Sequence, residues 1–339
     1  MAKQLTPDSL DLASSRSLLV LKPSSLGDIV HTLPAVALIK RAYPKLSIRW
    51  VVRSDFMAML ESNPDLDGVV EFPRSKMRGL SGVAKLWSWS KSALRQPAVP
   101  DVVIDFQGLA RSAVMAWRSG ACERIGISDA REGARFSHHW RVEVDADAHA
   151  VERYLAVPRA LGIDCDDATE LFRLPAGELP EGLRLPAEPF VMLHPFSAGK
   201  DKSLTPDQVA ELCDHLAPVP VCVVGRTDLE LPTLRSGAID LLNQTSIPEL
   251  IAVTRRAGFV VSVDSGPMHI AAAISDRLIS IHTWSDPRKV GPYAPEAWVW
   301  KGGKMQQQKA FDAGIAAERS LASSDLEEIA TKAKELMNR

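Results

Sequence analysis

The sequence predicts an α/β protein made of two halves, and three observations indicate this fold class. Apolar runs rich in β-branched residues, such as Val102–Phe106 and Phe259–Val263, have the composition of fully buried parallel strands. Each of these two runs is followed by a glycine-containing turn and then by a helical pattern. Four prolines punctuate residues 175–189, which is typical of a linker between two folding units.

Length and composition agree with this organisation. At 339 residues the chain is long for a single hydrophobic core, which favours two domains. Its 46% hydrophobic and 24% charged residues are those of an ordinary globular protein. The net charge of −2 provides no global positive field, so we expect no nucleic-acid partner.

The sequence also bears on compartment and metal content. The first residues lack the apolar core of a signal peptide, and no run of about 18 uncharged apolar residues could span a membrane. The four cysteines show neither CxxC pairing nor a histidine at zinc-binding spacing. We therefore expect a cytoplasmic protein with buried, reduced thiols and no zinc site built on these cysteines.

The first half opens with a strand, a turn and a helix. The turn after the first strand holds one glycine, Gly27, where a dinucleotide fingerprint needs three, and no GxxxxGK[ST] sequence occurs. A Rossmann dehydrogenase or a P-loop enzyme is therefore disfavoured. The expected strands are Ser17–Leu21, Ile48–Val52, Val69–Phe72, Val102–Phe106 and Arg124–Ile127, and the expected helices run from about Ile29 to Ala42, from Gln107 onward, and from His149 to about Leu161.

Two stretches of the first half allow more than one interpretation. A basic segment from Arg74 to Arg95 contains Trp87 and Trp89. It is expected to be a solvated helix face, with an anionic substrate site or a membrane surface as the alternative. His138 and His139 are expected in a surface loop, because they form no recognisable metal cluster.

The second half repeats the β/α rhythm. Thr205–Gln208 and Ser246–Glu249 are capping boxes with proline at an early helical position. The expected strands are Phe190–His194, Val219–Val224, Phe259–Val263 and, as the last strand, Leu278–His282. Ser324–Glu327 is expected to cap a terminal amphipathic helix that ends at Met337. The predicted domains are residues 1–174 and 190–310, joined by the linker at residues 175–189 and followed by a helical segment at residues 311–339.

Polar residues follow the predicted strands in both halves. Because ligands of open α/β sheets lie beyond the carboxyl ends of the strands, these residues predict a cleft between the halves. The first half supplies a carboxylate that can act as a base, and the second supplies a lysine and a helix start suited to a phosphate. The residues are Ser24, Ser25, Asp28, Gln107 and Arg111 in the first half, and Ser197, Lys202, Gly225, Asp264, Ser265, Gly266 and His269 in the second.

Several of these residues also have a purely structural interpretation. Asp28 could cap the helix that follows it, and Asp264 or Ser265 could cap the next helix. Lys202 could be an exposed lysine, His269 a buried core histidine, and Arg111 a partner in an ordinary salt bridge.

Several ordered motifs resemble the ADP-heptose:lipopolysaccharide heptosyltransferases, glycosyltransferase family 9. The opening stretch from Lys22 to Pro34 is similar to the first motif of that family, and the resemblance extends over roughly residues 17 to 300. The other motifs are Ile104–Leu109, His149–Arg153, Thr245–Leu250, Val263–Ala272, Ser285–Pro287 and Gly291–Tyr293.

The resemblance implies a GT-B architecture, in which two Rossmann-like domains with parallel sheets face a central cleft. It implies inverting, metal-independent transfer of heptose from ADP-heptose, a substrate rather than a cofactor, to the inner core of lipopolysaccharide. Asp28 resembles the catalytic base, and Lys202 the catalytic lysine that contacts the donor phosphates. The resemblance places the acceptor against the first domain, at Ser24, Ser25, Gly27, Gln107 and Arg111. It places the donor against the second domain, at Ser197, Lys202, Gly225, Glu230, Thr245, Asp264, Ser265, Gly266 and His269.

Some positions depart from the family pattern and leave alternatives open. Lys200 competes with Lys202 as the phosphate contact, Leu204 stands where tryptophan is common, and His282–Asp286 replaces a usual Gly-Pro-Thr-Asp. The alternatives are a transferase of the same family with another ADP-sugar or a protein acceptor, a GT-B sugar-nucleotide epimerase, and a binding protein without catalysis. The resemblance also allows peripheral contact with the cytoplasmic face of the inner membrane.

Overall fold

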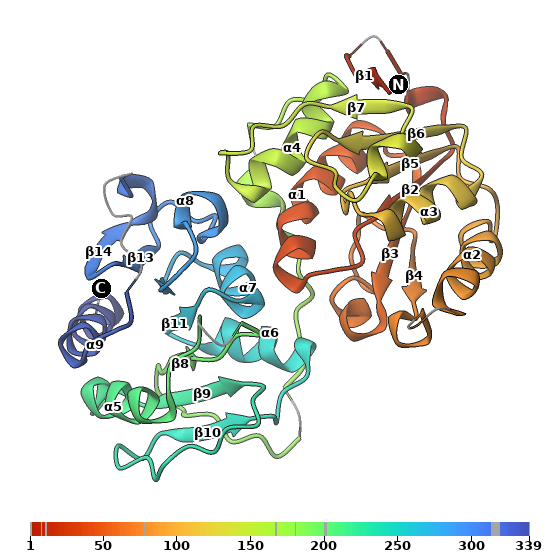
Figure 1. Cartoon of the computed structure of the whole chain (residues 1–339). Helices are drawn as coiled ribbons and strands as arrows, with labels where there is room; N and C mark the ends of the chain where they lie inside the picture. The colour runs from red at the N-terminus through yellow and green to blue at the C-terminus, as the bar shows by residue number, and fades with distance from the viewer. Residues whose placement is uncertain are drawn as a thin grey trace. The chain divides into compact units, whose positions relative to one another are not determined.

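The chain forms two compact units, Met1–Arg173 and Leu174–Arg339, as the computed structural model in Figure 1 shows. The structure describes residues 2–7, 9–10, 12–77, 79, 81–166, 168–179, 181–199, 202–312 and 319–338. Each unit is built around one seven-stranded sheet with helices packed on it. The residues described between 175 and 189 form neither helix nor strand.

The sheet of the first unit has the order β1-β7-β6-β5-β2-β3-β4, and its paired strands are parallel throughout the described residues. Its strands are β1 (Lys3–Gln4), β2 (Ser17–Leu21), β3 (Ser47–Arg53), β4 (Gly68–Phe72), β5 (Val102–Asp105), β6 (Glu123–Ile127) and β7 (Trp140–Val142). Its α-helices are α1 (Leu26–Ala42), α2 (Ser81–Leu94), α3 (Ala110–Ser119) and α4 (Ala150–Ala160). Short 3₁₀ turns are η1 (Leu12–Ser14), η2 (Ser54–Met59), η3 (Arg74–Met77), η4 (Ala134–Ser137) and η5 (Ala168–Leu171).

Two helix pairs cover the two faces of this sheet. Leu86 and Leu94 of α2 and Met115 of α3 join the strand residues Leu19 and Val103 in one buried cluster. Helix α1 packs against α4, and Figure 1 shows this pair on the other side of the strands. Because both faces are covered, the strands read as continuous apolar runs in the sequence.

The sheet of the second unit has the order β10-β9-β8-β11-β12-β13-β14 and is parallel except for the antiparallel β13–β14 pair. Its strands are β8 (Val191–His194), β9 (Val221–Gly225), β10 (Ile239–Leu242), β11 (Phe259–Val263), β12 (Leu278–His282), β13 (Trp298–Lys301) and β14 (Lys304–Gln307). Its helices are α5 (Pro206–Leu216), α6 (Ile247–Arg256), α7 (Gly266–Ile274), α8 (Pro287–Val290) and α9 (Ser323–Met337), with the 3₁₀ turn η7 (Gln308–Ala310).

Capping chemistry sets where the helices of the second unit begin. Thr205 accepts a hydrogen bond from the Gln208 N–H, and Ser246 accepts one from the Glu249 N–H, so both predicted capping boxes are present. Helices α5 and α9 pack together and bury Leu212 and Ile329 against the sheet. The core thus fixes the strand ends from which the polar loops emerge.

The structure corrects several expectations about individual elements. Leu278–His282 is not the last strand, because β13 and β14 follow it, and β7 and β10 were also not expected. These four strands lie at or near the sheet edges and have only three or four residues each, so each gives a weak strand signal in the sequence. Helix α1 starts at Leu26 rather than Ile29, and Ala322 rather than Ser324 is the N-cap of α9.

The predicted α/β class, with two Rossmann-like units of mostly parallel strands, is confirmed. None of the helices in the described part of the chain has the length and apolarity that a bilayer crossing requires.

Candidate active site

Asp28 lies in the first turn of α1, directly beyond the carboxyl end of β2. Ser25 is the N-cap, so Asp28 occupies the third helical position and is not itself the N-cap. Its Oδ2 accepts hydrogen bonds from the Ser25 hydroxyl (2.7 Å) and the Ser25 N–H (3.1 Å). Capping therefore fixes the carboxylate, while 35% of its side chain stays exposed.

The second oxygen of Asp28 belongs to a buried network. The Tyr154 hydroxyl of α4 donates to Asp28 Oδ1 at 2.9 Å. Lys22 Nζ, at the end of β2, donates to the Tyr154 oxygen at 2.7 Å and to the Phe106 carbonyl at 3.0 Å. It also lies 3.7 Å from Asp28 Oδ1. Tyr154 therefore connects the candidate base to Lys22, whose pKa is lowered by burial against the opposing effect of Asp28 and Asp105.

These contacts decide the charge on each group. Burial alone would raise the pKa of Asp28, but Lys22, the hydrogen bonds from Ser25 and the bond from Tyr154 outweigh it, so this pKa is lowered. Burial, followed by the charge of Asp28, raises the pKa of Tyr154 well above its usual value. At neutral pH the network therefore holds an ionised carboxylate beside a neutral phenol.

Gln107 joins this group, whereas Arg111 does not. The Ser24 N–H donates to Gln107 Oε1 at 3.3 Å, so Ser24, Ser25, Asp28 and Gln107 lie together at the strand ends. Arg111 is exposed on α3, with its guanidinium 5.9 Å from the centre of the Phe72 ring. Gly27 is buried within the first turn of α1.

The loop that carries Gln107 is held by a buried carboxylate. Asp105 Oδ1 accepts from the N–H groups of Gln107 and Gly108, and its Oδ2 accepts from the Ser112 hydroxyl. His138 Nε2 lies 3.1 Å from the same Oδ2. The expectation that His138 is a surface residue is wrong, because it is only 5% exposed.

Gly126 of β6 creates the space for His138. A Cβ atom at Gly126 would lie 2.0 Å from His138 Nδ1, far inside van der Waals contact. The histidine therefore reaches the buried carboxylate only because the neighbouring strand lacks a side chain at this position.

The second unit contains another polar cluster, at the carboxyl ends of β11 and β12. Lys202 Nζ and the Ser285 hydroxyl each donate to Asp264 Oδ2 at 2.5 Å. The Asp264 side chain is 7% exposed and that of Lys202 is 27% exposed. Burial would raise the pKa of Asp264, but His282, Lys202 and Ser285 outweigh this effect and lower it.

Two neutral histidines support this cluster from inside. His282 Nδ1 lies 2.9 Å from the Ser285 hydroxyl, and His194 Nδ1 lies 3.1 Å from the Ser265 hydroxyl. Burial lowers the pKa of each histidine to about 4, so both rings are uncharged at neutral pH. Within the cluster the positive charge at neutral pH therefore comes from Lys202.

The start of α7 can receive an anion. Ser265 is the N-cap, but its side chain makes no capping hydrogen bond. Pro267 has no N–H, and within the described residues no hydrogen bond is found for the Gly266 N–H. A helix N-terminus with an open amide favours a negatively charged group.

The remaining predicted donor residues differ in how far they are buried. Gly225 ends β9 with φ +142°, and a Cβ there would lie 3.3 Å from His194 Nε2, so glycine is required. Thr245 and His269 are buried, while Glu230 is exposed in the loop after β9. Ser197 is half-buried, and its Oγ accepts from the Gly199 N–H. Lys200, the alternative to Lys202, lies outside the described residues.

Residues 91–321 match the model of Glycosyltransferase family 9 (heptosyltransferase), which is more than half of the chain. The chain belongs to glycosyltransferase family 9. It is 27% identical over 298 residues to lipopolysaccharide heptosyltransferase 1 of Salmonella typhimurium, covering 81% of this chain and 90% of that protein.

Solved structures agree on the fold of this glycosyltransferase. The glycosyl transferase family 9 protein of Veillonella parvula aligns with a TM-score of 0.75 and 20% identity, over 97% of this chain and 99% of that chain. The E. coli heptosyltransferase WaaC with ADP-2-deoxy-2-fluoro heptose aligns with a TM-score of 0.69 and 24% identity, over 95% and 100% of the two chains. The predicted GT-B fold is confirmed, whereas the cleft that would join the two polar clusters stays a prediction.

Several residues of this family 9 enzyme were not anticipated as site residues. Tyr154 directly follows the motif His149–Arg153, and Lys22 is the first residue of the motif that ends at Pro34. Their positions in or beside the motifs are the signal that could have identified them. Ser285 and His282 lie in the stretch that departs from the family pattern. Trp284, 60% exposed, lies with its ring centre 5.5 Å from Lys202 Nζ. Only the fold shows that these side chains meet.

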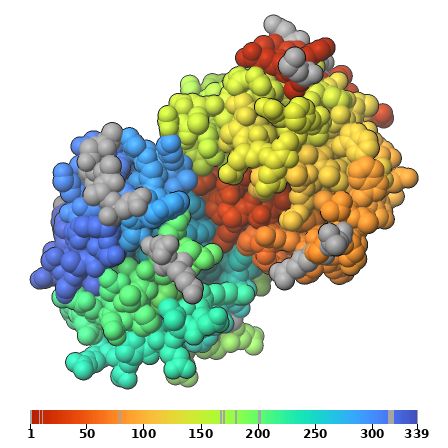
Figure 2. Space-filling view, viewed as in Figure 1, coloured from red at the N-terminus to blue at the C-terminus, as the bar shows by residue number. Residues whose placement is uncertain are grey.

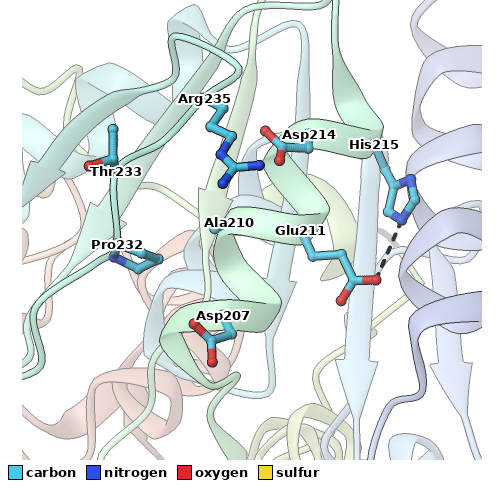
Figure 3. Close-up of a pocket in the computed structure, with 8 residues that line it drawn as sticks. All are labelled: Asp207, Ala210, Glu211, Asp214, His215, Pro232, Thr233 and Arg235. Carbon is cyan, nitrogen blue, oxygen red and sulfur yellow. Dashed lines mark ion pairs between the residues drawn. The ribbon is translucent and has the colours of Figure 1, made fainter.

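A hollow of about 530 Å³ in the second unit lies elsewhere (Figure 3). Its lining residues are Asp207, Ala210, Glu211, Asp214, His215, Pro232, Thr233 and Arg235. Figure 3 shows three carboxylates along α5, with Glu211 paired to His215. Because this lining is mainly acidic and contains none of the predicted site residues, a nucleotide diphosphate is disfavoured there.

Proposed function

We propose that this enzyme transfers heptose from ADP-heptose to an inner-core sugar of lipopolysaccharide, with inversion and with Asp28 as the general base. The family description and the name of the Salmonella relative support heptose transfer to lipopolysaccharide. The heptose analogue in the E. coli WaaC structure supports the donor.

The observation that carries the proposal is the environment of Asp28. The carboxylate is ionised, one-third exposed and fixed by hydrogen bonds to both oxygens. A general base must be deprotonated, reachable by the substrate and held in one orientation. Within the described residues of the first unit, Asp28 meets all three conditions at a strand end.

The reaction then follows from the chemistry of the two clusters. Asp28 takes the proton from an acceptor hydroxyl as that oxygen forms a bond to the anomeric carbon of heptose. The bond from this carbon to the diphosphate oxygen breaks, and ADP leaves with the electron pair. Attack from the side opposite to ADP inverts the anomeric configuration.

Lys202 and the N-terminus of α7 are proposed to receive the diphosphate. The Lys202 ammonium and the open Gly266 N–H supply positive charge and a donor at the departing oxygen atoms. In this proposal Ser197, Gly225, Glu230, Thr245 and His269 contact the rest of the donor, and Ser24, Gln107 and Arg111 the acceptor. The proposal uses no cofactor and no metal.

Substitution of Asp28 tests the proposal. We expect Asp28→Asn to lower kcat by at least about 10²-fold, the lower range for loss of a general base, while the Kd for ADP stays the same. Product mass and acceptor-dependent ADP release are the measurements. Asp55→Asn, an exposed carboxylate paired with Arg53, is the control. A kcat near that of the wild type would remove Asp28 from the role of base.

A second candidate is transfer from another ADP-sugar or to a protein acceptor. It is favoured by the stretch His282–Asp286, which departs from the family pattern and places His282 and Ser285 against Asp264. Incubation with ADP-heptose and with other ADP-sugars, followed by product mass, distinguishes the donors. Family membership favours transfer over epimerisation, and ADP release only in the presence of acceptor would confirm transfer.

We also propose a cytoplasmic location with peripheral contact at the inner membrane, because the proposed acceptor is part of a lipid. Fractionation of cells that express the chain tests this location.

A further inference from the structure

One region of the first unit has an unusual charge composition. Residues 73–100 and 106–122 contain no Asp or Glu, although the whole chain has a net charge of −2. The same two stretches hold eight cationic residues: Arg74, Lys76, Arg78, Lys85, Lys91, Arg95, Arg111 and Arg118. Four of these residues lie on helices α2 and α3, which pack against each other. The segment that was expected to be an ordinary solvated helix face thus carries positive charges and no negative ones.

The same two helices expose large apolar side chains. Val83 is 68% exposed, Trp87 42% and Trp117 52%. The rings of Trp87 on α2 and Trp117 on α3 lie with their centres 4.9 Å apart. We call the exposed surface formed by Val83, Lys85, Trp87, Lys91, Trp117 and Arg118 the α2–α3 face. Figures 1 and 2 show α2 in orange at the surface of the unit.

Within the α2–α3 face, the positive charge of Arg118 lies against both indole rings. Its guanidinium lies 4.4 Å from the centre of the Trp87 ring and 6.0 Å from that of Trp117. Its Nε–H donates to the Trp87 carbonyl at 3.4 Å. The two indoles and the cation are therefore held as one unit rather than as three separate surface residues.

Most of the described cations of this region have no carboxylate partner among the described residues. Among the described residues, no ion pair is found for Lys76, Lys85, Lys91, Arg95, Arg111 or Arg118. Elsewhere in the first unit, surface cations do pair, as in Lys40–Asp67 and Arg159–Glu152. The positive charge of the α2–α3 face is thus available to an external anion.

We infer that the α2–α3 face docks on an anionic lipid bilayer, with Trp87 and Trp117 entering the headgroup region. Indole rings prefer the membrane–water interface, and lysine and arginine are attracted by negatively charged lipid headgroups. An exposed apolar patch rimmed by unpaired cations satisfies both requirements at once. A purely phosphate-binding surface would need the cations but would gain nothing from the exposed Val83 and the two adjacent, tilted indoles.

This inference rests on the proposed function only for the idea that the acceptor is anchored in a lipid. The test therefore uses the full chain with vesicles and with neither donor nor acceptor, so either proposal can fail alone. We expect the wild type to float with vesicles of phosphatidylglycerol and phosphatidylcholine, and not with phosphatidylcholine alone. Lipids brominated near the headgroup should quench part of the tryptophan fluorescence.

Two double variants test the α2–α3 face, and a third double variant is the control. The double substitution Trp87→Ala with Trp117→Ala should remove the part of the tryptophan fluorescence that the brominated lipids quench. It should also weaken vesicle binding at least about tenfold. Lys85→Glu with Lys91→Glu should weaken binding by a similar factor, because each charge near the bilayer contributes. Lys45→Glu with Lys304→Glu makes the same change in net charge at exposed lysines outside the face and should bind like the wild type.

Circular dichroism and thermal melting establish that each variant is folded before binding is compared. Binding that is equal in the wild type and both face variants would overturn the inference, as would an absence of vesicle binding by the wild type. Vesicle binding without bromine quenching would also overturn it, since the indoles would then stay in water. If the control variant lost as much vesicle binding as the Lys85→Glu, Lys91→Glu variant, net charge alone would explain the effect. That result would contradict binding through the α2–α3 face.

Discussion

Tyr154 is the residue that connects the candidate base to a buried cation. Its hydroxyl donates to Asp28 and accepts from Lys22, and both contacts favour the ionised carboxylate. We expect Tyr154→Phe to raise the pKa of Asp28, so the acidic limb of the kcat pH profile moves to higher pH. At neutral pH kcat should fall about tenfold, the scale of one hydrogen bond to a charged group.

A pH profile separates this positioning role from a general loss of structure. Tyr43→Phe, at the C-cap of α1, is the matched control, because it makes the same chemical change away from Asp28. A Tyr154→Phe enzyme whose acidic limb coincides with that of the wild type would contradict the positioning role. Reduced kcat with an unmoved profile would indicate only lost packing.

Lys202 is expected to contribute to donor binding through its charge. We predict that Lys202→Ala weakens ADP binding by about 1–3 kcal/mol, the scale of charge-assisted hydrogen bonds. Titration calorimetry measures this change, and Lys304→Ala on β14 is the control, since that lysine is exposed. An unchanged Kd would show that Lys202 serves only its ion pair with Asp264.

The motifs predicted much of the candidate site, but not its supporting contacts. Ser24, Ser25, Asp28 and Gln107 meet at one set of strand ends, and Lys202, Asp264 and Ser265 lie at another. Tyr154 is 126 residues from Asp28 in the sequence. No local pattern encodes a contact over such a separation, so only the fold reveals it.

At the scale of elements, the best predictions were those with a clear physical signal. The strands β2, β11 and β12 have the predicted bounds because both faces of each are buried and their residues are apolar. The start of α1 was missed because Ser25 and Asp28 form the capping box with an aspartate at its third helical position, where the usual signal is Glu or Gln. The strands β7, β10, β13 and β14 were missed because each has only three or four residues, which is too short for a clear pattern.

Two strand ends of the second sheet make its stability depend on pH. The pKa of His194 at the end of β8 and that of His282 at the end of β12 are lowered by burial to about 4, against 6.5 for an exposed ring. Between these values the unfolded chain binds more protons, so stability should fall as the pH drops from 6.5 toward 4. The loss is roughly 1.4 kcal/mol per pH unit for each histidine within that window.

Thermal melts across this range check the expectation. His282→Gln keeps a neutral polar side chain near Ser285 and should give a shallower decline of Tm with falling pH. His215→Gln is the control, because its ring is one-third exposed. An equally steep decline in the His282→Gln protein would show that other groups dominate the acid sensitivity.

At the scale of the whole molecule, each unit has its own sheet and its own hydrophobic core. The candidate base lies in one unit, and the candidate diphosphate site lies in the other. The proposed reaction therefore requires both units, and in this proposal Lys202 and α7 meet the charge of the leaving group.

Because the proposed diphosphate site uses Lys202 and the N-terminus of α7, the proposal predicts how the enzyme responds to a chelator. We expect the rate of heptose transfer to be the same with and without EDTA, because in the proposed mechanism an ammonium and helix N–H groups take the place of a divalent cation. Acceptor-dependent ADP release is the measurement. Inhibition by EDTA that added Mg²⁺ reverses would contradict metal-independent transfer.

The space that Gly126 leaves for His138 has an evolutionary consequence. A larger residue at 126 would displace the imidazole from Asp105, and the loop carrying Gln107 would lose part of its anchor. Among natural homologues, the two positions should therefore covary. A lineage that acquires a side chain at 126 should also carry something smaller than histidine at 138, although neither position belongs to a recognised motif.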